Sequence, residues 1–318
     1  MDRHPFLTPQ RSYPILRIHS ERRLREHDRA CPFRLELGAP CRSRALRCSE
    51  LVLCLLFISI GMPAFLFDSA SVVAQPQEQA NKIIERSVDN LKRDWAAEPR
   101  FDCSEHDKDK NGTRTYQDIM LYGSQYQKLM ALNDKPLDAR QQAEQEQKFQ
   151  AAASNRQAET DSEKRERIAK YAAQRKHATQ LILELTKAFT FTIAGTGKLG
   201  AHDVYILNAE PRKGYVPPNT DTRVLTGMRG KLWIERTSFQ WVKVDVEVFR
   251  AVSIGGFIAR VEPGTRFEFE QEPVSAGIWL PSHFAVRSRS KIMFLFNRQT
   301  DEDDTYFDYH PAQNSASS

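Results

Sequence analysis

Apolar and polar residues alternate along most of the second half of the chain, residues 189–310. An alternation with a period of two predicts strands that have one buried and one solvent-exposed face. The stretches 230–236, 241–248 and 266–270 show it most clearly. The pattern therefore predicts a long curved antiparallel β-sheet in an α+β fold, with an apolar face that other elements must cover.

Two segments ahead of this region have the spacing of helices. Within 79–95, apolar residues recur every three or four positions, at Ile83, Ile84, Val88 and Leu91. Residues 133–188 form a longer charged segment whose middle, 141–164, has almost no apolar stripe apart from Phe149. That middle part is expected to be a solvent-exposed helix or to be partly disordered. The last part, 168–188, is expected to pack on the sheet through Ile168, Tyr171, Ala172, His177, Leu181, Ile182, Leu185 and then Phe189.

Two strands, 100–106 and 113–130, are expected between the helical segments. The connection Asp107–Gly112 matches the first half of a calcium loop, and Asp118 lies at the twelfth position. Arg114 at the eighth position and the flanking strands depart from that motif. Asn111-Gly112 between strands is a strong hairpin signal, so a turn without metal is expected.

The N-terminal part has the order of a secretory signal. Arginines precede the apolar run 51–67, and small residues end it at Ala74. The run is broken by Gly61 and Pro63, which favours cleavage near Ala74 over a membrane anchor. We expect 1–49 to be a leader or the product of a mis-set start, 50–74 to be the signal peptide, and 75–318 to be a single domain. The mature protein is then periplasmic or secreted, and only the uncleaved signal would contact a membrane.

The basic charge of the chain comes mainly from this leader. The formal net charge is +5, and the first 74 residues contribute +4 through 11 Arg against 7 acidic residues. Later basic residues are interleaved with acidic ones, which is typical of a solvated surface and argues against nucleic-acid binding. Four of the five cysteines also precede residue 75, so the mature chain keeps Cys103 alone and no zinc motif.

Motifs that carry chemistry are weak. Gly195–Gly200 fits a dinucleotide-binding fingerprint, but a strand pattern follows it where a helix is required, so a turn is expected and no cofactor. The four acids Asp301–Asp304 are expected to form a charged hairpin tip. No arrangement of a nucleophile, a general base or metal ligands is evident, which argues against an enzyme.

The order of elements and several short sequence segments resemble those of the LolA-like group of periplasmic half-barrels, which includes RseB-like sensor domains. These segments are 211–215, 230–235, Gly264-Thr265 and 271–281. The resemblance covers about residues 76–310 and implies a curved sheet around a hydrophobic cavity, which in a carrier holds lipoprotein acyl chains. The lipoprotein carrier itself is expected to have no counterpart of the polar stretch 133–165.

The resemblance implies a binder or carrier of a lipid or lipoprotein. The alternative is a sensor or scaffold that binds another envelope protein and has a filled core. The residues expected on the inner sheet face, as ligand contacts or as core, come from three strands: Val242, Val244, Val246, Val248, Phe267, Phe269, Ile292, Phe294 and Phe296.

Overall fold

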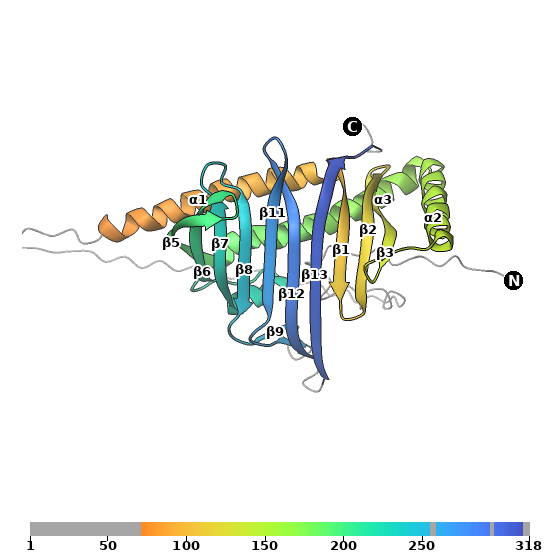
Figure 1. Cartoon of the computed structure of the whole chain (residues 1–318). Helices are drawn as coiled ribbons and strands as arrows, with labels where there is room; N and C mark the ends of the chain where they lie inside the picture. Colours follow the sequence, from red (N-terminus) through yellow and green to blue (C-terminus); the bar gives the residue numbers. More distant parts are fainter. Residues whose placement is uncertain (1–70, 255–258, 293–295, 314–318) are drawn as a thin grey trace, which may run out of the picture.

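A single antiparallel sheet organises the described part of the chain. The structure is a computed structural model that describes residues 71–254, 259–292 and 296–313. The strand order is β4-β3-β2-β1-β13-β12-β11-β8-β7-β6-β5. Outside this path, β10 pairs with β12 and with β9. The outermost strands of that order, β4 and β5, do not pair with each other, so the sheet is open. This is the α+β architecture with a large antiparallel sheet that the alternating pattern predicted (Figure 1).

The element bounds are as follows. The helices are α1 (Ser71–Ala97), η3 (Glu98–Arg100), α2 (Ala139–Gln157), α3 (Asp161–Ala188) and η4 (Asp221–Gly227). The strands of the first half are β1 (Phe101–Asp109), β2 (Gly112–Leu121), β3 (Ser124–Leu132), β4 (Lys135–Pro136), β5 (Phe189–Leu199) and β6 (His202–Pro211). The remaining strands are β7 (Met228–Glu235), β8 (Trp241–Val248), β9 (Val252–Ile254), β10 (Ala259–Val261), β11 (Arg266–Ser275), β12 (Ile278–Ile292) and β13 (Phe296–Pro311).

Helix α1 lies on one face of the sheet, which we call the inner face (Figure 1). Its apolar stripe is buried, and Ser87 within the stripe accepts a hydrogen bond of 2.9 Å from the indole Nε1 of Trp241 on β8. The predicted cleavage after Ala74 lies in the first turn of α1. Pro76 follows it, at a position where a helix starting near Gln75 tolerates proline, because the first backbone N–H groups have no intrahelical partner.

Helix α3 crosses the inner face and contacts the sheet near both of its ends (Figure 1). Near its start, Tyr171 donates a hydrogen bond of 3.5 Å to Met120 Sδ on β2, and Ile168 packs against Gly123 in the β2–β3 turn. At its end, Ala188 is fully buried and runs directly into β5. Between these ends, the guanidinium of Arg175 donates to the Glu98 carboxylate at 3.1 Å and to the Trp95 carbonyl, which ties α3 to the end of α1.

Helix α2 is the solvent-exposed helix expected within 141–164. None of its side chains is buried, and a capping box formed by Asp138 and Gln141 starts it. Phe149 packs against Tyr126 of β3 in a tilted ring contact with 5.6 Å between ring centroids, which holds the helix beside the sheet. The segment predicted as one helical region is divided at 158–160, where Thr160 and Glu163 form a second capping box that starts α3.

The prediction of one strand over 113–130 is wrong. Tyr122 and Gly123 both have positive φ, at 48° and 90°, and make a tight turn that divides the segment into β2 and β3. Two arginines fix this turn. Arg156 donates to the carbonyl oxygens of Leu121 and Ser124 at 2.9 Å, and Arg167 donates to the Tyr122 carbonyl at 3.1 Å.

Candidate functional site

The inner face consists of side chains in continuous cross-strand rows. One row begins with charged residues and ends with apolar ones: Arg114 (β2), Asp107 (β1), Asp304 (β13), Phe284 (β12), Phe269 (β11), Val244 (β8), Leu232 (β7), Leu207 (β6) and Ile193 (β5). The next row repeats the change: Asp109, Glu302, Val286, Phe267, Val246, Gly230, Ala209 and Phe191. These two rows of the inner face are therefore apolar from β5 to β12 and acidic on β13 and β1.

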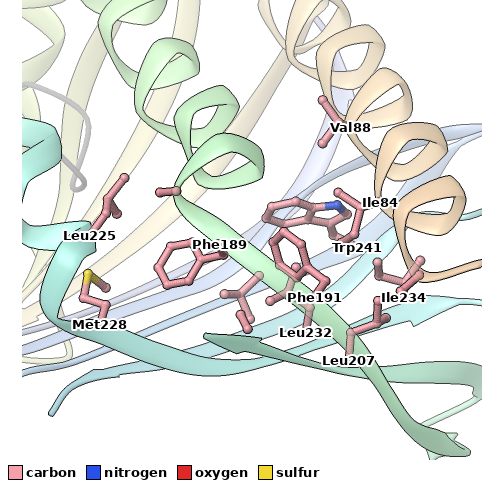
Figure 2. Close-up of a cluster of buried hydrophobic side chains, with 14 of the residues drawn as sticks. Ile84, Val88, Phe189, Phe191, Leu207, Leu225, Met228, Leu232, Ile234 and Trp241 are labelled. Carbon is pink, nitrogen blue, oxygen red and sulfur yellow. The ribbon is translucent and has the colours of Figure 1, made fainter. Parts of the chain in front are cut away.

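The apolar side of this face is a packed core over β5–β8. Figure 2 shows Ile84 and Val88 of α1 facing Trp241, Phe189 and Leu207 of the sheet. Val244 and Val248 belong to this cluster, with 7% and 0% of their surface exposed. These two valines lie on the inner face, as the alternation predicted, and they fill the space beneath the helices.

Three of the predicted inner-face residues remain partly exposed at the edge of this core. They are Val246, Phe267 and Phe269, which pack against the cluster without being fully buried. Phe267 lies directly opposite Val246, and Phe269 directly opposite Val244. The centre of the sheet thus presents an apolar surface beside the filled core, on the face that α1 and α3 cover.

The prediction that all four valines of β8 share one face is wrong for Val242. The register shifts between Trp233, which pairs with Lys243, and Ile234, which pairs with Trp241, so Val242 is an extra residue in the ladder. A bulge of this kind turns a side chain away from the face that alternation assigns to it. Val242 instead packs with Val204 and Trp279 in a separate cluster on the other, outer face.

The remaining predicted contacts are Ile292, Phe294 and Phe296. Ile292 ends β12 and Phe296 begins β13, and the two pair across the hairpin. Phe294 lies outside the described residues, as do the side chains of Ile292 and Phe296.

The acidic segment Asp301–Asp304 is part of β13, so the prediction of a hairpin tip is wrong. Alternation within the strand turns Glu302 and Asp304 to the inner face and Asp301 and Asp303 to the outer face. Asp303 on the outer side lies 3.1 Å from His283 Nε2, whereas Asp304 is fully buried. The buried acid was missed because a run of four charges was assumed to face water.

The connection after Asp107 is the predicted hairpin turn. Asp107 lies within β1 opposite Arg114, and Asp109 Oδ1 accepts a hydrogen bond of 2.7 Å from the backbone N–H of Asn111. Burial raises the pKa of Asp109, but the hydrogen bonds from Asn111 and the charge of Arg114 outweigh it and lower that pKa below its ordinary value. Among the described residues, no three His, Cys, Asp or Glu side chains are placed to hold a metal ion.

The carboxyl of Asp118 on β2 also belongs to the acidic part of the inner face. Gln127 of β3 lies directly opposite Asp118 and donates a hydrogen bond of 2.5 Å to Glu105 Oε2. Asp118 Oδ1 is buried without a hydrogen-bond partner. Burial raises the pKa of Asp118 to about 7, against hydrogen bonds from Gln127 and Gln125 that lower it. The sequence signal for the position of Asp118 was its spacing from Arg114 and Tyr116, because residues two apart in a strand lie on one face.

We expect Asp118→Asn to stabilise the protein above neutral pH. The folded-state pKa lies above the ordinary value of about 3.9 in an unfolded chain, so the folded state holds the proton more tightly. The stabilising contribution of this carboxyl is present below about pH 4 and is lost as pH rises through about 7. At pH 8 the variant should therefore be more stable than the parent by about 1–3 kcal/mol, and near pH 4 the two should be alike.

Urea unfolding at pH 4, 6 and 8 measures this difference. Asp203→Asn is the matched control, because the Asp203 side chain is 60% exposed and its replacement should change little across this range. Equal stability of Asp118→Asn and the parent at pH 8 would contradict the raised pKa.

The outer face carries a shallow polar depression over β6–β8 and β11. Its volume is about 540 Å³, and its lining residues are Asn208, Glu210, Arg229, Gly230, Lys231, Trp233, Asp245, Glu247 and Arg266. Arg229 pairs with Glu247 at 2.9 Å, and Arg266 pairs with Asp245. These cross-strand ion pairs are typical of a solvated sheet face.

The glycine motif 195–200 is located in β5 and in the turn to β6. Gly200 has φ of 57° and makes the turn with Ala201, and the chain continues as β6. The prediction of a turn between strands is confirmed for Gly200, whereas Gly195 and Gly197 lie within β5 and pair with β6. The helix N-terminus that a pyrophosphate site needs does not follow these glycines.

Comparisons with known proteins return solved structures only; no family model and no curated protein matches the chain. A domain described as an outer membrane lipoprotein-sorting protein from Vibrio parahaemolyticus is 11% identical, with a TM-score of 0.33, covering 74% of this chain and 94% of its own. A DUF1329 family protein from Desulfovibrio piger is 11% identical, with a TM-score of 0.32, covering 75% and 94%. A LolA superfamily protein from Nitrosomonas europaea is 12% identical, with a TM-score of 0.27, covering 73% and 93%.

Similarity at this level transfers no ligand, partner or activity to this chain.

Proposed function

We propose that this protein is a non-catalytic binding protein that holds the acyl chain of a lipid or lipoprotein against the centre of the inner sheet face. The observation that supports the proposal is the partly exposed surface of Val246, Phe267 and Phe269, on the face that the helices cover. A ligand there would extend the existing core by continuing its cross-strand rows.

The physical driving force is burial of methylene groups. Each one removed from water contributes about 0.8 kcal/mol, so a chain that covers two phenylalanines gains affinity without any catalytic group. The filled cluster over β5–β8 leaves the partly exposed side chains of Val246 on β8 and of Phe267 and Phe269 on β11 as the place for such a chain. Binding of this kind needs polar groups only to orient the ligand, and it needs no group that reacts with the ligand.

The proposed site of action is the periplasm or the exterior of the cell, after cleavage near Ala74. Cleavage there would retain the buried stripe of α1, which starts at Ala80. Residues 1–70, including the apolar run, lie outside the described residues. Within the described part of the chain, none of the helices has an apolar stretch long enough to span a bilayer.

A second candidate is a scaffold or sensor that binds another envelope protein. The packed cluster of Figure 2 favours it, since a sheet whose inner face is filled by its own helices binds partners through other surfaces. The two candidates differ in whether Phe269 belongs to a ligand surface or to the packed core.

The test is the substitution Phe269→Ala with Phe307→Ala as its control. Phe307 has the same side chain, lies on β13 with 40% of its surface exposed, and faces the outer side of the sheet. Binding of dodecyl maltoside below its micellar concentration is measured by calorimetry, and unfolding by urea. Native mass spectrometry of the mature parent protein looks for a co-purified lipid.

We expect Phe269→Ala to weaken probe binding about tenfold and to cost about 1–2 kcal/mol of stability, because its side chain is only partly buried. Phe307→Ala should leave both quantities unchanged. A loss of about 3–5 kcal/mol, typical of a filled core, together with no probe binding by the parent, would exclude the carrier and leave the scaffold.

A further inference from the structure

Arginine side chains gather on the outer face at one end of the sheet. This is the end near β9 in Figure 1, where β8 and β12 finish and β7 and β11 begin. One cross-strand row there has Arg229 on β7, Glu247 on β8, Arg266 on β11 and Arg287 on β12. Arg289 is two positions further along β12, so it lies on the same face as Arg287. This part of the outer face is therefore rich in arginine.

The two arginines of β12 lack a carboxylate partner. Arg287 lies directly opposite Arg266, and like charges at such positions destabilise a sheet. The arginines of β7 and β11 in this row are already paired with acids of β8. Asp301, on the other side of Arg287, accepts a hydrogen bond of 3.0 Å from Gln299 instead. Within the part of the chain that the structure describes, Arg287 and Arg289 are exposed and form no ion pair.

An aromatic side chain is exposed beside these arginines. Phe249 follows β8 with 37% of its surface exposed, and the guanidinium carbons of Arg229 and Arg250 lie 5.2 and 5.6 Å from the centre of its ring. Gly264, in the turn before β11, donates to the Val248 carbonyl beside this ring. A Cβ on that glycine would meet no atom within 4 Å, so the surface there is open. An exposed aromatic ring among cations is a combination that binds membrane interfaces.

We call this surface the arginine patch, and it consists of Arg229, Phe249, Arg250, Arg266, Arg287 and Arg289. We infer that the arginine patch docks the mature protein on a membrane surface that contains anionic phospholipid. Lipid phosphates supply the negative charge that Arg287 and Arg289 lack, and guanidinium groups bind phosphate oxygens in a bidentate geometry. Phe249 enters the headgroup region, whereas a soluble polyanion would use the charges and not the ring. The patch lies on the face opposite Val246 and Phe267, so docking does not depend on the proposed function.

The experiment measures binding of the mature protein to sedimented vesicles of phosphatidylcholine, with or without about one-third phosphatidylglycerol. Polyphosphate, measured by calorimetry, is the soluble polyanion. The variants are Phe249→Ala and the double variant Arg287→Gln/Arg289→Gln. The matched control is Arg140→Gln/Arg165→Gln, which removes two exposed arginines from α2 and α3. Every variant has the same N-terminus, so a contribution from that segment is common to all. Near-ultraviolet circular dichroism checks that the fold persists.

We expect the parent to bind the anionic vesicles at least about tenfold more tightly than the neutral ones, and this preference should fall with added salt. Arg287→Gln/Arg289→Gln should weaken binding to anionic vesicles about twentyfold, because each basic side chain near an anionic surface contributes about fivefold. Phe249→Ala should weaken it about threefold and leave polyphosphate binding unchanged. Arg140→Gln/Arg165→Gln should stay within about twofold of the parent, since those charges lie beyond the screening length.

Equal binding of the parent to both kinds of vesicle overturns the inference, and so does an equal loss in the two double variants. If Phe249→Ala binds anionic vesicles as the parent does, and the loss of Arg287 and Arg289 weakens polyphosphate binding equally, the partner is a soluble polyanion and not a membrane. If the double variant fails to fold, Asp301→Asn decides the matter. Removing the acid opposite Arg287 should strengthen binding to anionic vesicles about threefold, and unchanged binding would contradict the inference. The dodecyl maltoside measurement tests the proposed function separately.

Discussion

Gly230→Ala is expected to destabilise the protein by at least about 3 kcal/mol, because the new methyl group would meet backbone atoms that side-chain rotation cannot move away. A Cβ at Gly230 would lie 2.2 Å from the Asp245 carbonyl oxygen and 2.6 Å from Val246 Cα. Both atoms belong to β8, the neighbour of β7. The two strands would have to separate in the middle of the sheet, where β7 is paired on both sides.

The matched control is Gly197→Ala in the edge strand β5. A Cβ there would meet only Ile206 Cδ1, at an ordinary contact distance of 3.5 Å. Alanine also lowers the entropy of the unfolded chain, so this variant should be neutral or slightly stabilised, within about 0.5–1 kcal/mol. Urea unfolding of the two variants gives the comparison. A Gly230→Ala variant as stable as the parent would show that β7 and β8 lie further apart than the structure places them.

The strands were predictable from the sequence because their alternation reflects burial on one face only. Val244 and Val248 lie in the core as the period of two requires. Val242 does not, because β8 has one extra residue at Trp241–Val242 relative to its partner β7. The alternation Val-Lys-Val continues through this bulge, so the sequence pattern gives no sign of it. A bulge depends on the register of the partner strand, which a single segment does not encode.

The acidic part of the inner face could not be found in the same way. Alternation alone would have turned Glu302 and Asp304 to one face, but charges were assigned to solvent because they are almost never fully buried without partners. The pairing of β13 with β1 brings Asp304 opposite Asp107, which is 197 positions earlier in the chain. This juxtaposition arises from topology, and neither segment indicates it locally.

The division between filled core and partly exposed surface was also inaccessible from the sequence. Val244 and Phe269 pair across adjacent strands and are both apolar, yet Val244 is buried and Phe269 is only partly so. The difference depends on where α1 and the end of α3 lie over the sheet, and that is set by packing between distant segments. The sequence therefore predicted the inner-face residues as a group and left core and cavity as alternatives.

Phe189→Ala is expected to cost about 3–5 kcal/mol, the range for truncating a buried aromatic side chain in a packed core. Phe189 is 2% exposed and is located where α3 ends and β5 begins. Figure 2 shows its ring between Leu225 and Met228 on one side and Phe191 on the other. The ring centroids of Phe189 and Phe191 are 6.3 Å apart, so truncation also removes an aromatic contact.

The control for this variant is Phe249→Ala, since Phe249 follows β8 with 37% of its surface exposed and should lose less than about 1 kcal/mol. Urea unfolding ranks Phe189→Ala, Phe269→Ala and Phe249→Ala on one scale. The structure places Phe269 between the other two, because its exposure is intermediate and it lies at the edge of the cluster. If Phe269→Ala were as costly as Phe189→Ala, the centre of the sheet would be as filled as β5–β8, and no surface would remain there for a chain. If Phe189→Ala cost as little as Phe249→Ala, the packed cluster itself would be contradicted.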